Sequence, residues 1–402
     1  MITVHAIIIG GGVAGPATAM ALQRAGIDAT VYEAYDRTAD GVGAFLTLAV
    51  NGLEALRVLG LDEHVARLGI DTPRITLRNG AGRALATFEN GPRRPDGTVS
   101  QTVRRADLYV ALRDEAVRRG VEVRFGKRLV DARHDGDGVV AEFADGTTAR
   151  GDLLIGADGL RSQVRRVIDP SAPPARYVGL LNTGGFTRGV EVDAPPGEVQ
   201  MVFGRRSFFG YLPAPDGSVW WFANPPRADE PADGELATST EAWRAELVAL
   251  HEVDDGPAAE LVRRAQVLLP AWPTHDIPSV PTWHRGRMVI VGDAAHATSP
   301  SSGQGASLAL EDAVVLAKAL RDAPDVPTAF AAYEQQRRAR VERVVAYGKR
   351  TGDHKSPGPL GRVVRDLFIR VALPLQAKRA PRAMAWLYDY RIDWDEPIAA
   401  AA

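Results

Sequence analysis

Apolar and amphipathic segments alternate along the first third of the chain. An apolar run at residues 2–9 leads into a stretch with helical spacing of apolar side chains at 16–24, and a second apolar run follows at 29–32. Apolar residues three and four positions apart indicate helices, and short apolar runs indicate buried strands. Strands that alternate with helices are typical of an α/β fold with a parallel sheet. The same alternation continues with predicted elements at 41–48, 52–59, 105–119 and 121–125.

Hairpin signals interrupt this alternation. Asn79-Gly80, Asp145-Gly146 and Asp216-Gly217 each lie between two short runs that favour strands. Such dipeptides suit the tight turns that join antiparallel strands. The first and last of these turns predict a mixed β-sheet region that is inserted between parts of the α/β fold.

The last part of the chain is predicted to be helical. Residues 328–349 have the charged pattern of a helix that lies on the surface of the α/β part. A second helix, from 360 to 375, carries apolar residues on one stripe with arginines opposite. We expect this stripe to pack on the protein itself or in a dimer, in preference to docking on a membrane surface. Its residues are Leu360, Val363, Val364, Leu367, Phe368 and Val371.

Composition excludes several classes of function. The chain has 402 residues, a formal net charge of −2 and a pI of about 6.5, which do not suit a nucleic-acid-binding surface. It has no cysteine, which excludes disulfides, iron–sulfur clusters, thiolate catalysis and a cysteinyl link to a flavin. No apolar run reaches the ~18 residues of a membrane-spanning helix, and the first strand starts without a recognisable leader sequence. We therefore expect a cytoplasmic protein that is a monomer or a homodimer.

A dinucleotide-binding fingerprint occupies the first junction between strand and helix. Gly10, Gly12 and Gly15 lie at this junction, and the second strand ends at Glu33. The glycines permit a tight turn and close approach of a pyrophosphate to the helix N-terminus, while the acid accepts hydrogen bonds from a ribose. An acid at that position disfavours a 2′-phosphate, so the expected ligand is FAD or NAD(H). A formal match at 136–141 lies between strands with no helix after it, and we interpret it as a turn.

A second motif, Asp158-Gly159, follows another apolar strand and precedes a helix start. The carboxylate suits either an N-cap or a dinucleotide contact, and the sequence does not decide between them. In the second case, Arg161 and Arg165 are available as phosphate partners.

A third motif, Gly292-Asp293, also ends an apolar strand, and a glycine-bounded helix start follows at 303–306. The carboxylate can bind a sugar-like hydroxyl, and free amides at a helix start favour negative charge above them. The chain contains no second complete fingerprint. A nicotinamide cofactor used together with FAD would therefore bind transiently at a shared site.

The three motifs, in this order, resemble those of the class A flavoprotein monooxygenases, the p-hydroxybenzoate hydroxylase-like family of FAD-dependent aromatic hydroxylases. The resemblance covers residues 1 to about 350, and Ser307 departs from it where asparagine is frequent. It implies that the first motif holds the ADP part of FAD, that Asp158 serves FAD and the reduced nicotinamide, and that Asp293 binds a flavin-side hydroxyl. The cofactor-binding residues that it implies are Gly10, Gly12, Val13, Ala14, Gly15, Glu33, Gly43, Arg105, Val130, Asp158, Gly159, Gly292, Asp293, Pro300, Gly303, Gly305 and Ala306.

The resemblance also implies an activity. We expect non-covalent FAD, reduction by NADH or NADPH, and transfer of one oxygen atom of O2 to an aromatic or polycyclic small molecule through a flavin C4a-hydroperoxide. The product would be hydroxylated or epoxidised. Two alternatives stay open: a flavin-dependent reductase or dehydrogenase on the same scaffold, and a non-redox flavoprotein that binds or cyclises a ligand.

The expected fold is α/β, with a Rossmann-type FAD-binding domain, an inserted mixed β-sheet substrate domain and C-terminal helices. The FAD-binding domain is discontinuous and is expected to comprise 1–73, 97–175 and 271–350. The substrate domain is expected at 74–96 and 176–270, and the C-terminal helical segment at 351–402.

The inserted sheet supplies candidates for a substrate pocket. Period-two alternation places Phe209 and Tyr211 on one face of a strand, and most aromatic side chains of this region suit a sheet core. We expect one aromatic face to contact the substrate. The chain shows no metal-ligand spacing and no nucleophile elbow, so we predict no metal and assign no catalytic residue. The expected pocket residues are Leu46, Leu48, Phe209, Tyr211, Phe222 and Pro300.

Overall fold

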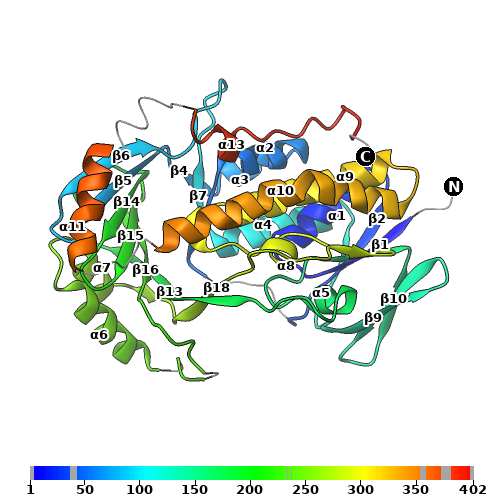
Figure 1. Ribbon diagram of the computed structural model, residues 1–402, viewed down its shortest axis with the longest axis horizontal. Coiled ribbons are helices and arrows are strands. Elements are labelled where there is room, and N and C mark those ends of the chain that lie inside the picture. The colour runs from blue at the N-terminus through cyan, green and yellow to red at the C-terminus, as the bar shows by residue number, and fades with distance from the viewer. Residues whose placement is uncertain are drawn as a thin grey trace.

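The computed structural model describes residues 4–36, 43–232, 234–236, 238–353, 359–372 and 382–398. The molecule is elongated, with a parallel-sheet half and a mixed-sheet half at opposite ends of its long axis (Figure 1). The long helix α10 (Val326–Asp353) runs along the first half toward the second. No helix of the described residues combines the length and the apolar character that crossing a membrane requires.

The parallel-sheet half contains the fold predicted for the dinucleotide motifs. Its six-stranded sheet has the order β19-β20-β12-β1-β2-β8, and only β19 pairs antiparallel. The central strands β1, β12 and β20 are buried and almost entirely apolar because other elements cover them, whereas the edge strands β8 and β19 carry charged, exposed residues. The strands are β1 (His5–Ile9), β2 (Asp28–Tyr32), β8 (Glu122–Arg124), β12 (Leu153–Gly156), β19 (His284–Arg285) and β20 (Met288–Ile290). The helices of this half are α1 (Ala14–Arg24), α2 (Val50–Val58), α3 (Asp62–Ala66), α4 (Arg105–Arg118), α5 (Gln163–Ile168), α8 (Asp293–His296), η1 (Pro300–Ser302), α9 (Gly305–Asp322) and α10.

Two small three-stranded sheets flank the parallel sheet. One has the order β11-β10-β9, with β9 (Leu129–Asp135), β10 (Gly138–Phe143) and β11 (Thr148–Gly151). The formal glycine match at 136–141 begins at the turn between β9 and β10, as predicted. The other has the order β3-β7-β4, with β3 (Phe45–Leu48), β4 (Gly69–Asp71) and β7 (Gln101–Arg104). Part of the strand that was expected at 41–48 lies outside the described residues.

The mixed-sheet half is built on one eight-stranded sheet, in which β17-β13-β16-β15-β14-β5-β6 are neighbours and β18 pairs with β13. Most pairs are antiparallel, but β14 and β5 are parallel. The hairpins predicted at Asn79-Gly80 and Asp216-Gly217 are present as β5–β6 and β15–β16. The strands are β5 (Arg74–Asn79), β6 (Ala84–Glu89), β13 (Arg176–Arg188), β14 (Glu198–Phe203), β15 (Phe208–Pro213), β16 (Ser218–Asn224), β17 (Val267–Leu268) and β18 (Trp272–Asp276).

The two faces of this sheet have different surroundings. Phe209, Tyr211 and Trp221 pack in one cluster with Trp243 and Leu247 of α6 (Thr240–His251) and with residues of α7 (Ala258–Arg263). The alternate side chains point to the other face, where Leu212 and Trp220 pack with Phe45 of β3. The sheet is therefore closed by helices on one face and meets the parallel-sheet half on the other.

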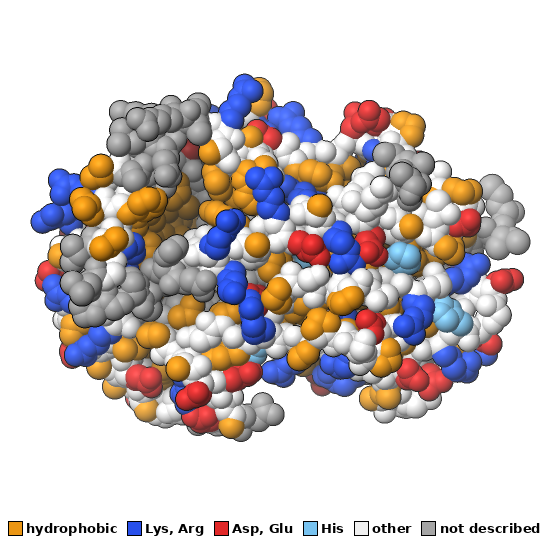
Figure 2. Space-filling model, in the orientation of Figure 1, with side chains coloured by type: hydrophobic (Ala, Val, Ile, Leu, Met, Phe, Trp, Pro, Cys, Tyr) orange, Lys and Arg blue, Asp and Glu red, His pale blue; other side chains and the backbone are white. Residues whose placement is uncertain are grey.

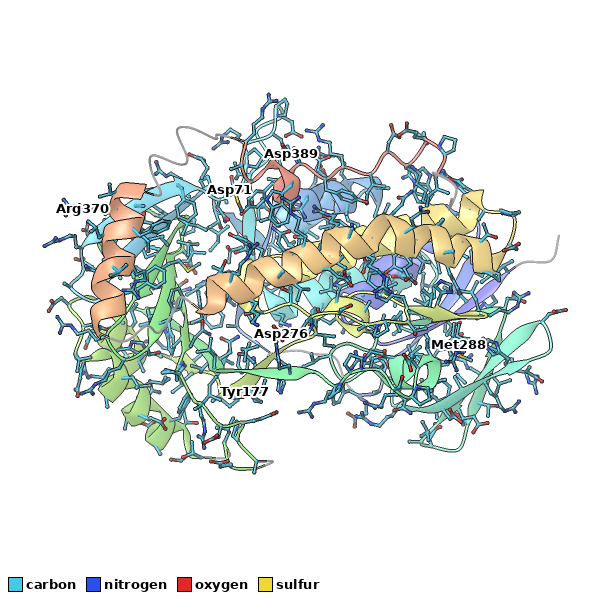
Figure 3. All side chains as sticks on the ribbon, in the orientation of Figure 1. Asp71, Tyr177, Asp276, Met288, Arg370 and Asp389 are labelled. Atoms are coloured by element: carbon cyan, nitrogen blue, oxygen red, sulfur yellow. The ribbon has the colours of Figure 1, made fainter. Side chains whose placement is uncertain are left out.

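The connection between the halves runs through β13 and β18. Figure 3 shows Tyr177 and Asp276 on these strands, near the middle of the long axis. Arg176 and Asp276 form an ion pair of 2.7 Å there, and the carboxylate is buried. This pair fixes the long strand β13 where it leaves the mixed sheet.

The C-terminal residues pack on both halves. Helix α11 (Pro359–Leu367) and the π-helical turn η2 (Phe368–Ala372) lie at the outer end of the mixed sheet, whereas α13 (Ala385–Tyr388) lies over α2 (Figure 1). Arg340 of α10 donates hydrogen bonds to the carbonyl oxygens of Trp386 and Leu387.

Candidate cofactor site and substrate face

The three sequence motifs meet at one edge of the parallel sheet. β1, β2, β12 and β20 are parallel, so the residues that follow their carboxyl ends come together. The loop at Gly10 reaches the β12 end so closely that a Cβ on Gly10 would lie 2.4 Å from the Ala157 carbonyl oxygen. A Cβ on Gly292 would lie 3.2 Å from the Ala14 Cβ at the start of α1. The first motif therefore contacts both of the others.

The glycines of the first motif have different reasons to be glycine. Gly10 has a φ of 109°, and a Cβ on Gly15 would lie 1.9 Å from the Gly10 carbonyl oxygen, so the fold itself requires both. Among the described residues, no atom would lie within 4 Å of a Cβ on Gly12. The space above Gly12 is thus open to a group from outside the chain. The start of α1 beside it, at Val13 and Ala14, has no side-chain cap, so its amides remain available to an anion.

Glu33 is held at the tip of this loop. One of its carboxylate oxygens accepts a 2.6 Å hydrogen bond from the Gly11 amide, and the other accepts a 3.0 Å bond from the Tyr35 amide. A carboxylate has about four acceptor positions, so both oxygens can still accept from the hydroxyls of a ribose.

The Asp158 carboxylate lies at the N-terminus of α5. One oxygen accepts hydrogen bonds from the Gln163 and Val164 amides, and the other accepts from the Ser162 hydroxyl. Burial raises the pKa of this carboxyl, although these hydrogen bonds oppose the shift. The N-cap residue itself is Ser162, whose hydroxyl accepts a 2.9 Å hydrogen bond from the Arg165 amide, so Asp158 supports the cap from four residues earlier. Gly159 beside it has a φ of 74° and would leave open space around a Cβ, so the loop can also admit a ligand.

The interpretation of Arg165 as a phosphate partner is wrong. Its guanidinium is buried and donates hydrogen bonds to the carbonyl oxygens of Ala294 and Leu160, at 2.8 Å each. Arg165 thereby ties α5 to the Asp293 loop. Arg161 is exposed, and Val130 lies nearby on β9, where its carbonyl oxygen accepts from the Gln163 side chain.

Asp293 is exposed between two buried neighbours, Gly292 and Ala294. The start of α9 lies beside it, since a Cβ on Gly305 would be 4.0 Å from an Asp293 carboxylate oxygen. The side chain of Gln304, the N-cap residue of α9, does not accept a hydrogen bond from the helix, so the Gly305 and Ala306 amides are not capped by it. Gly303 has a φ of 62° with open space around a Cβ, and Pro300 is exposed. A carboxylate and an uncapped 18-residue helix thus face the same space.

Arg105 completes this side of the site. A Cβ on Gly43 would lie 2.8 Å from the Arg105 Cδ, so the glycine lets the arginine lie against the chain. The Arg105 Nε donates a 2.6 Å hydrogen bond to the Tyr109 hydroxyl. Burial lowers the pKa of Arg105, but Tyr109 and the Asp293 carboxylate outweigh that effect and raise it. Arg105 and Asp293 therefore place opposite charges near one another.

A buried ionic cluster, which was not predicted from the sequence, holds the third motif through the Gly292 amide. Arg337 of α10 is 0% exposed and makes ion pairs of 2.6 Å with Glu311 and 2.7 Å with Asp312, both on α9. Asp312 accepts a 2.8 Å hydrogen bond from the Gly292 amide and lies 2.5 Å from the His296 Nε2. Burial raises the pKa of Asp312, but His296 and Arg337 more than offset this and hold it well below its usual range.

Glu311 connects the same cluster to the other side of the site. It accepts a 2.7 Å hydrogen bond from the Asn51 side chain, which also donates at 2.9 Å to the Gln304 side chain. Ser307 accepts a 3.2 Å bond from the Ala49 amide, so this departure from the family pattern helps to dock α2 on α9. The signal in the sequence was an adjacent Glu-Asp pair within the apolar pattern of α9.

The structure divides the expected substrate pocket. Phe209 and Tyr211 lie in the cluster under α6 and α7, on the face turned away from Phe45, so grouping them with Leu46 is incorrect. Leu48 is also fully buried, in the core of the parallel-sheet half. Helices α6 and α7, which were not predicted from the sequence, cover the Phe209 face.

Phe222 lies on the other face and is partly accessible. Its ring covers the backbone of Gly210, where a Cβ would be 2.2 Å from the ring, so only glycine allows the ring to lie there. The Phe45 ring approaches edge-on, at 5.9 Å between centroids. Phe45 and Leu46 are also half-buried. Phe222 and Phe45 therefore form a partly accessible apolar platform on the face of the mixed sheet that meets the parallel-sheet half.

These features fit FAD. The open space at Gly12 and the uncapped α1 start suit a pyrophosphate, Glu33 suits a ribose, and Asp293 with the α9 start suits a polar group that carries negative charge. No three His, Asp or Glu side chains of the described residues are grouped to hold a metal ion.

Comparisons with known proteins agree with this fit. The profile of the FAD binding domain family matches residues 3–347. The chain is 33% identical over 358 residues to an FAD-dependent urate hydroxylase of Klebsiella pneumoniae, covering 87% of this chain and 89% of that protein. It is 31% identical over 393 residues to 3-amino-4-hydroxybenzoate 2-monooxygenase of Streptomyces cremeus, covering 95% and 94%. The crystal structure of Klebsiella pneumoniae HpxO with FAD and uric acid superposes with a TM-score of 0.81 at 30% identity, covering 91% and 92%.

Proposed function

Since the chain belongs to the FAD binding domain family and is an FAD-dependent monooxygenase, we propose that it consumes NADH or NADPH and transfers one oxygen atom of O2 to an aromatic or polycyclic small molecule. The observation that carries this proposal is the open aromatic platform of Phe222 and Phe45, which belongs to the sheet face that meets the cofactor-binding half. When bound, FAD supplies the redox chemistry, and we propose that it follows the oxygen-transfer route expected from the sequence.

The residues at the start of α9 have an electrostatic role in this proposal. Reduced flavin is most reactive toward O2 as an anion, and uncapped amides at the positive end of a long helix stabilise negative charge. Gly305 and Ala306 would supply these amides, and Asp293 would accept a hydrogen bond from a hydroxyl of the cofactor. The chain thus holds the cofactor and stabilises its charge without contributing a nucleophile.

The substrate contacts proposed for this chain are apolar. The Phe222 ring offers a flat surface for an aromatic ring, and Phe45 contacts it edge-on. We propose that Leu46, which packs on the core of the parallel-sheet half, and the exposed Pro300 also contact the substrate. A pocket lined in this way excludes water, which favours oxygen transfer over release of hydrogen peroxide. We assign no general base. His296 is unsuited to that role because it is 3% exposed and already paired with Asp312.

The nicotinamide is proposed to bind transiently, because the chain has one complete dinucleotide fingerprint. NADH or NADPH would approach the space that the substrate later occupies. We also propose that the protein is located in the cytoplasm and is a monomer or a homodimer.

The test is nicotinamide oxidation by the FAD-loaded protein, measured together with oxygen uptake and peroxide release across a panel of phenols and fused-ring aromatics. We expect at least one panel member to stimulate oxidation of NADH or NADPH about ten-fold or more, with oxygen consumed and little peroxide released. Stimulated oxidation that continues without oxygen would identify a reductase. A panel member that binds without stimulating oxidation of either cofactor would contradict the redox proposal.

A further inference from the structure

The segment between α8 and α9, residues 297–304, joins two proposed contacts of the site, and we call it the Pro300 loop. Pro300 is exposed on it as a proposed substrate contact, and Gln304 leads directly into the first amides of α9. Hydrogen bonds within the loop define its shape. The Ser302 amide donates to the Ser299 carbonyl oxygen at 3.0 Å, and the Gln304 amide donates to the Ser302 hydroxyl at 3.2 Å. The position of this loop therefore affects both the proposed substrate face and the cofactor site.

The C-terminal part of α10 packs directly against the Pro300 loop. A Cβ on the buried Gly348 would lie 2.9 Å from the Thr298 Oγ1 and 3.0 Å from the Ser302 Cβ, closer than side chains normally pack. One turn later, a Cβ on Gly352 would lie 3.4 Å from the Ser301 Oγ, which is an ordinary van der Waals distance. Of these two glycines, only Gly348 lies too close to the loop to carry a side chain without displacing it.

The backbone conformation does not explain why residue 348 is glycine. It lies within the 28-residue helix α10 and does not have the positive φ that favours glycine. Glycine in the interior of a helix is less favourable than alanine, because it loses more conformational freedom on folding. The close approach of the Pro300 loop is the contact in the structure that accounts for this glycine.

Thr298 connects this contact to the start of α9. Its Oγ1 lies against Gly348, and a Cβ on Gly305 would lie 3.6 Å from its Cγ2. A carboxylate oxygen of Asp293 lies 4.0 Å from the same Cβ position. Thr298 is thus packed between α10 and the first turn of α9. A shift of Thr298 away from Gly348 would therefore also move it relative to the cofactor-binding amides.

The end of α10 that carries Gly348 reaches toward the mixed-sheet half (Figure 1). Figure 2 shows a hollow with hydrophobic walls beside this end of the helix. The Pro300 loop is therefore held where the proposed substrate face meets the cofactor-binding half.

We propose that Gly348 is a positioning residue for the cofactor and the substrate. Because it has no side chain, the Pro300 loop lies against α10, and through Thr298 this contact fixes where the first amides of α9 lie. This inference rests on the proposed function, in which those amides stabilise the charge of the reduced flavin and Pro300 contacts the substrate. Glycine at position 348 thus serves the reaction as well as the fold.

Gly348→Ala tests the inference through the reduction potential of bound FAD, measured by anaerobic reduction with reference dyes. We expect a more negative potential, because displaced amides stabilise the reduced, anionic flavin less. Gly352→Ala is the matched control: it brings the same gain in intrinsic helix stability, meets only ordinary contacts, and should leave the potential unchanged. An unchanged potential in Gly348→Ala, or an equal shift in both variants, would overturn the inference.

The second measurement is steady-state turnover with a panel member that stimulates nicotinamide oxidation. We expect Gly348→Ala to lower kcat for coupled oxygen transfer about ten-fold and to change KM less than about two-fold, because a displacement of about 1 Å can cost about a hundred-fold in rate. Gly352→Ala should retain the kcat of the unsubstituted protein. Equal kcat values in the two variants would contradict the inference.

Thr298→Ser serves if Gly348→Ala does not fold. It keeps the Oγ1 that lies against Gly348 but removes the methyl group that lies beside Gly305. The start of α9 then loses a contact that holds it in place, so the potential of bound FAD should again become more negative. An unchanged potential in this variant would overturn the inference.

The reduction potential separates this inference from the proposed function, because its measurement needs neither substrate nor nicotinamide. If the potential shifts in Gly348→Ala alone, but panel members bind the unsubstituted protein without stimulating oxidation of either nicotinamide, the redox proposal fails and the positioning role stands. If the unsubstituted protein couples oxygen transfer to nicotinamide oxidation, and Gly348→Ala changes neither the potential nor kcat, the positioning role fails and the proposed function stands.

Discussion

The two halves of the molecule use glycine in opposite ways. In the parallel-sheet half, no described atom would lie within 4 Å of a Cβ on Gly12, so the position leaves room for a group that the chain does not contain. In the mixed-sheet half, the Phe222 ring fills the corresponding space at Gly210, with a ring atom 2.2 Å from where a Cβ would lie. The proposed pyrophosphate site thus depends on backbone left uncovered by a side chain, whereas the proposed substrate face depends on a side chain that covers the backbone. Substitution can alter the second while the first stays intact.

The two halves also differ in their buried ionisable groups. In the parallel-sheet half, Arg337 pairs with Glu311 and Asp312, and Arg340 also pairs with Glu311. The two carboxylates accept hydrogen bonds from Gly292 and Asn51, on either side of the proposed cofactor site. In the mixed-sheet half, both ring nitrogens of His251 are buried and have no hydrogen-bond partner within the described residues. One half therefore holds compensated charge, and the other holds a group that must stay neutral. Four predictions test this comparison, from the largest expected effect to the smallest.

Removing the central arginine should have the largest effect. Arg337→Met leaves the Glu311 and Asp312 carboxylates buried with reduced compensation, which should lower the free energy of unfolding by about 3–5 kcal/mol. The measurement is urea unfolding of the FAD-loaded protein, followed by tryptophan fluorescence. Arg338→Met is the matched control on the next residue, whose ion pairs with Glu334 and Glu342 are partly exposed and should contribute less than about 1 kcal/mol. Equal decreases in the free energy of unfolding would show that the buried cluster contributes no more to stability than a partly exposed ion pair.

The two faces of the mixed sheet should respond differently to the same substitution. Phe209→Ala removes a fully buried ring and should lower the free energy of unfolding by about 3–5 kcal/mol, with no change in the peroxide released per nicotinamide oxidised. Phe222→Ala should cost less stability and should raise that peroxide fraction, because water enters the open platform. Stability comes from urea unfolding, and coupling comes from a peroxide assay. The division of the sheet into a core face and a substrate face fails if Phe209→Ala alone uncouples the reaction.

The two faces of the mixed sheet show which features could be predicted from the sequence and which could not. The meeting of the three motifs at one sheet edge was predictable, because their glycines and acids follow parallel strands at spacings that local geometry dictates. Alternation also predicted that Phe209 and Tyr211 share a face. It did not show which face α6 and α7 cover, because that depends on packing between segments far apart in the sequence. The Arg337 cluster was missed for the same reason, since its arginine and its carboxylates lie on different helices.

Lowering the pH should destabilise the mixed-sheet half through His251. Burial lowers the pKa of His251 to about 4 from an ordinary value of 6.5. The folded state therefore favours the neutral ring, and its contribution to stability is complete above pH 6.5 and declines as the pH falls toward 4. At pH 5 the expected loss is about 2 kcal/mol. His251→Leu should flatten the dependence of urea unfolding on pH in this range, and an unchanged slope would contradict the assignment.

The smallest effect is expected at Gly12, where it should appear only in the presence of FAD. Gly12→Ala places a methyl group in open space, so thermal unfolding of the apoprotein should not change. The methyl group occupies room proposed for the pyrophosphate and should weaken FAD binding about ten-fold, or about 1.4 kcal/mol. Flavin fluorescence measures this affinity. Gly210→Ala is the counterpart in the other half: it should lower apoprotein stability because the new methyl group collides with Phe222, and it should leave FAD affinity unchanged. Equal destabilisation of the apoprotein by both variants would contradict this comparison. It would mean that the fold itself requires glycine at position 12, as it does at position 210.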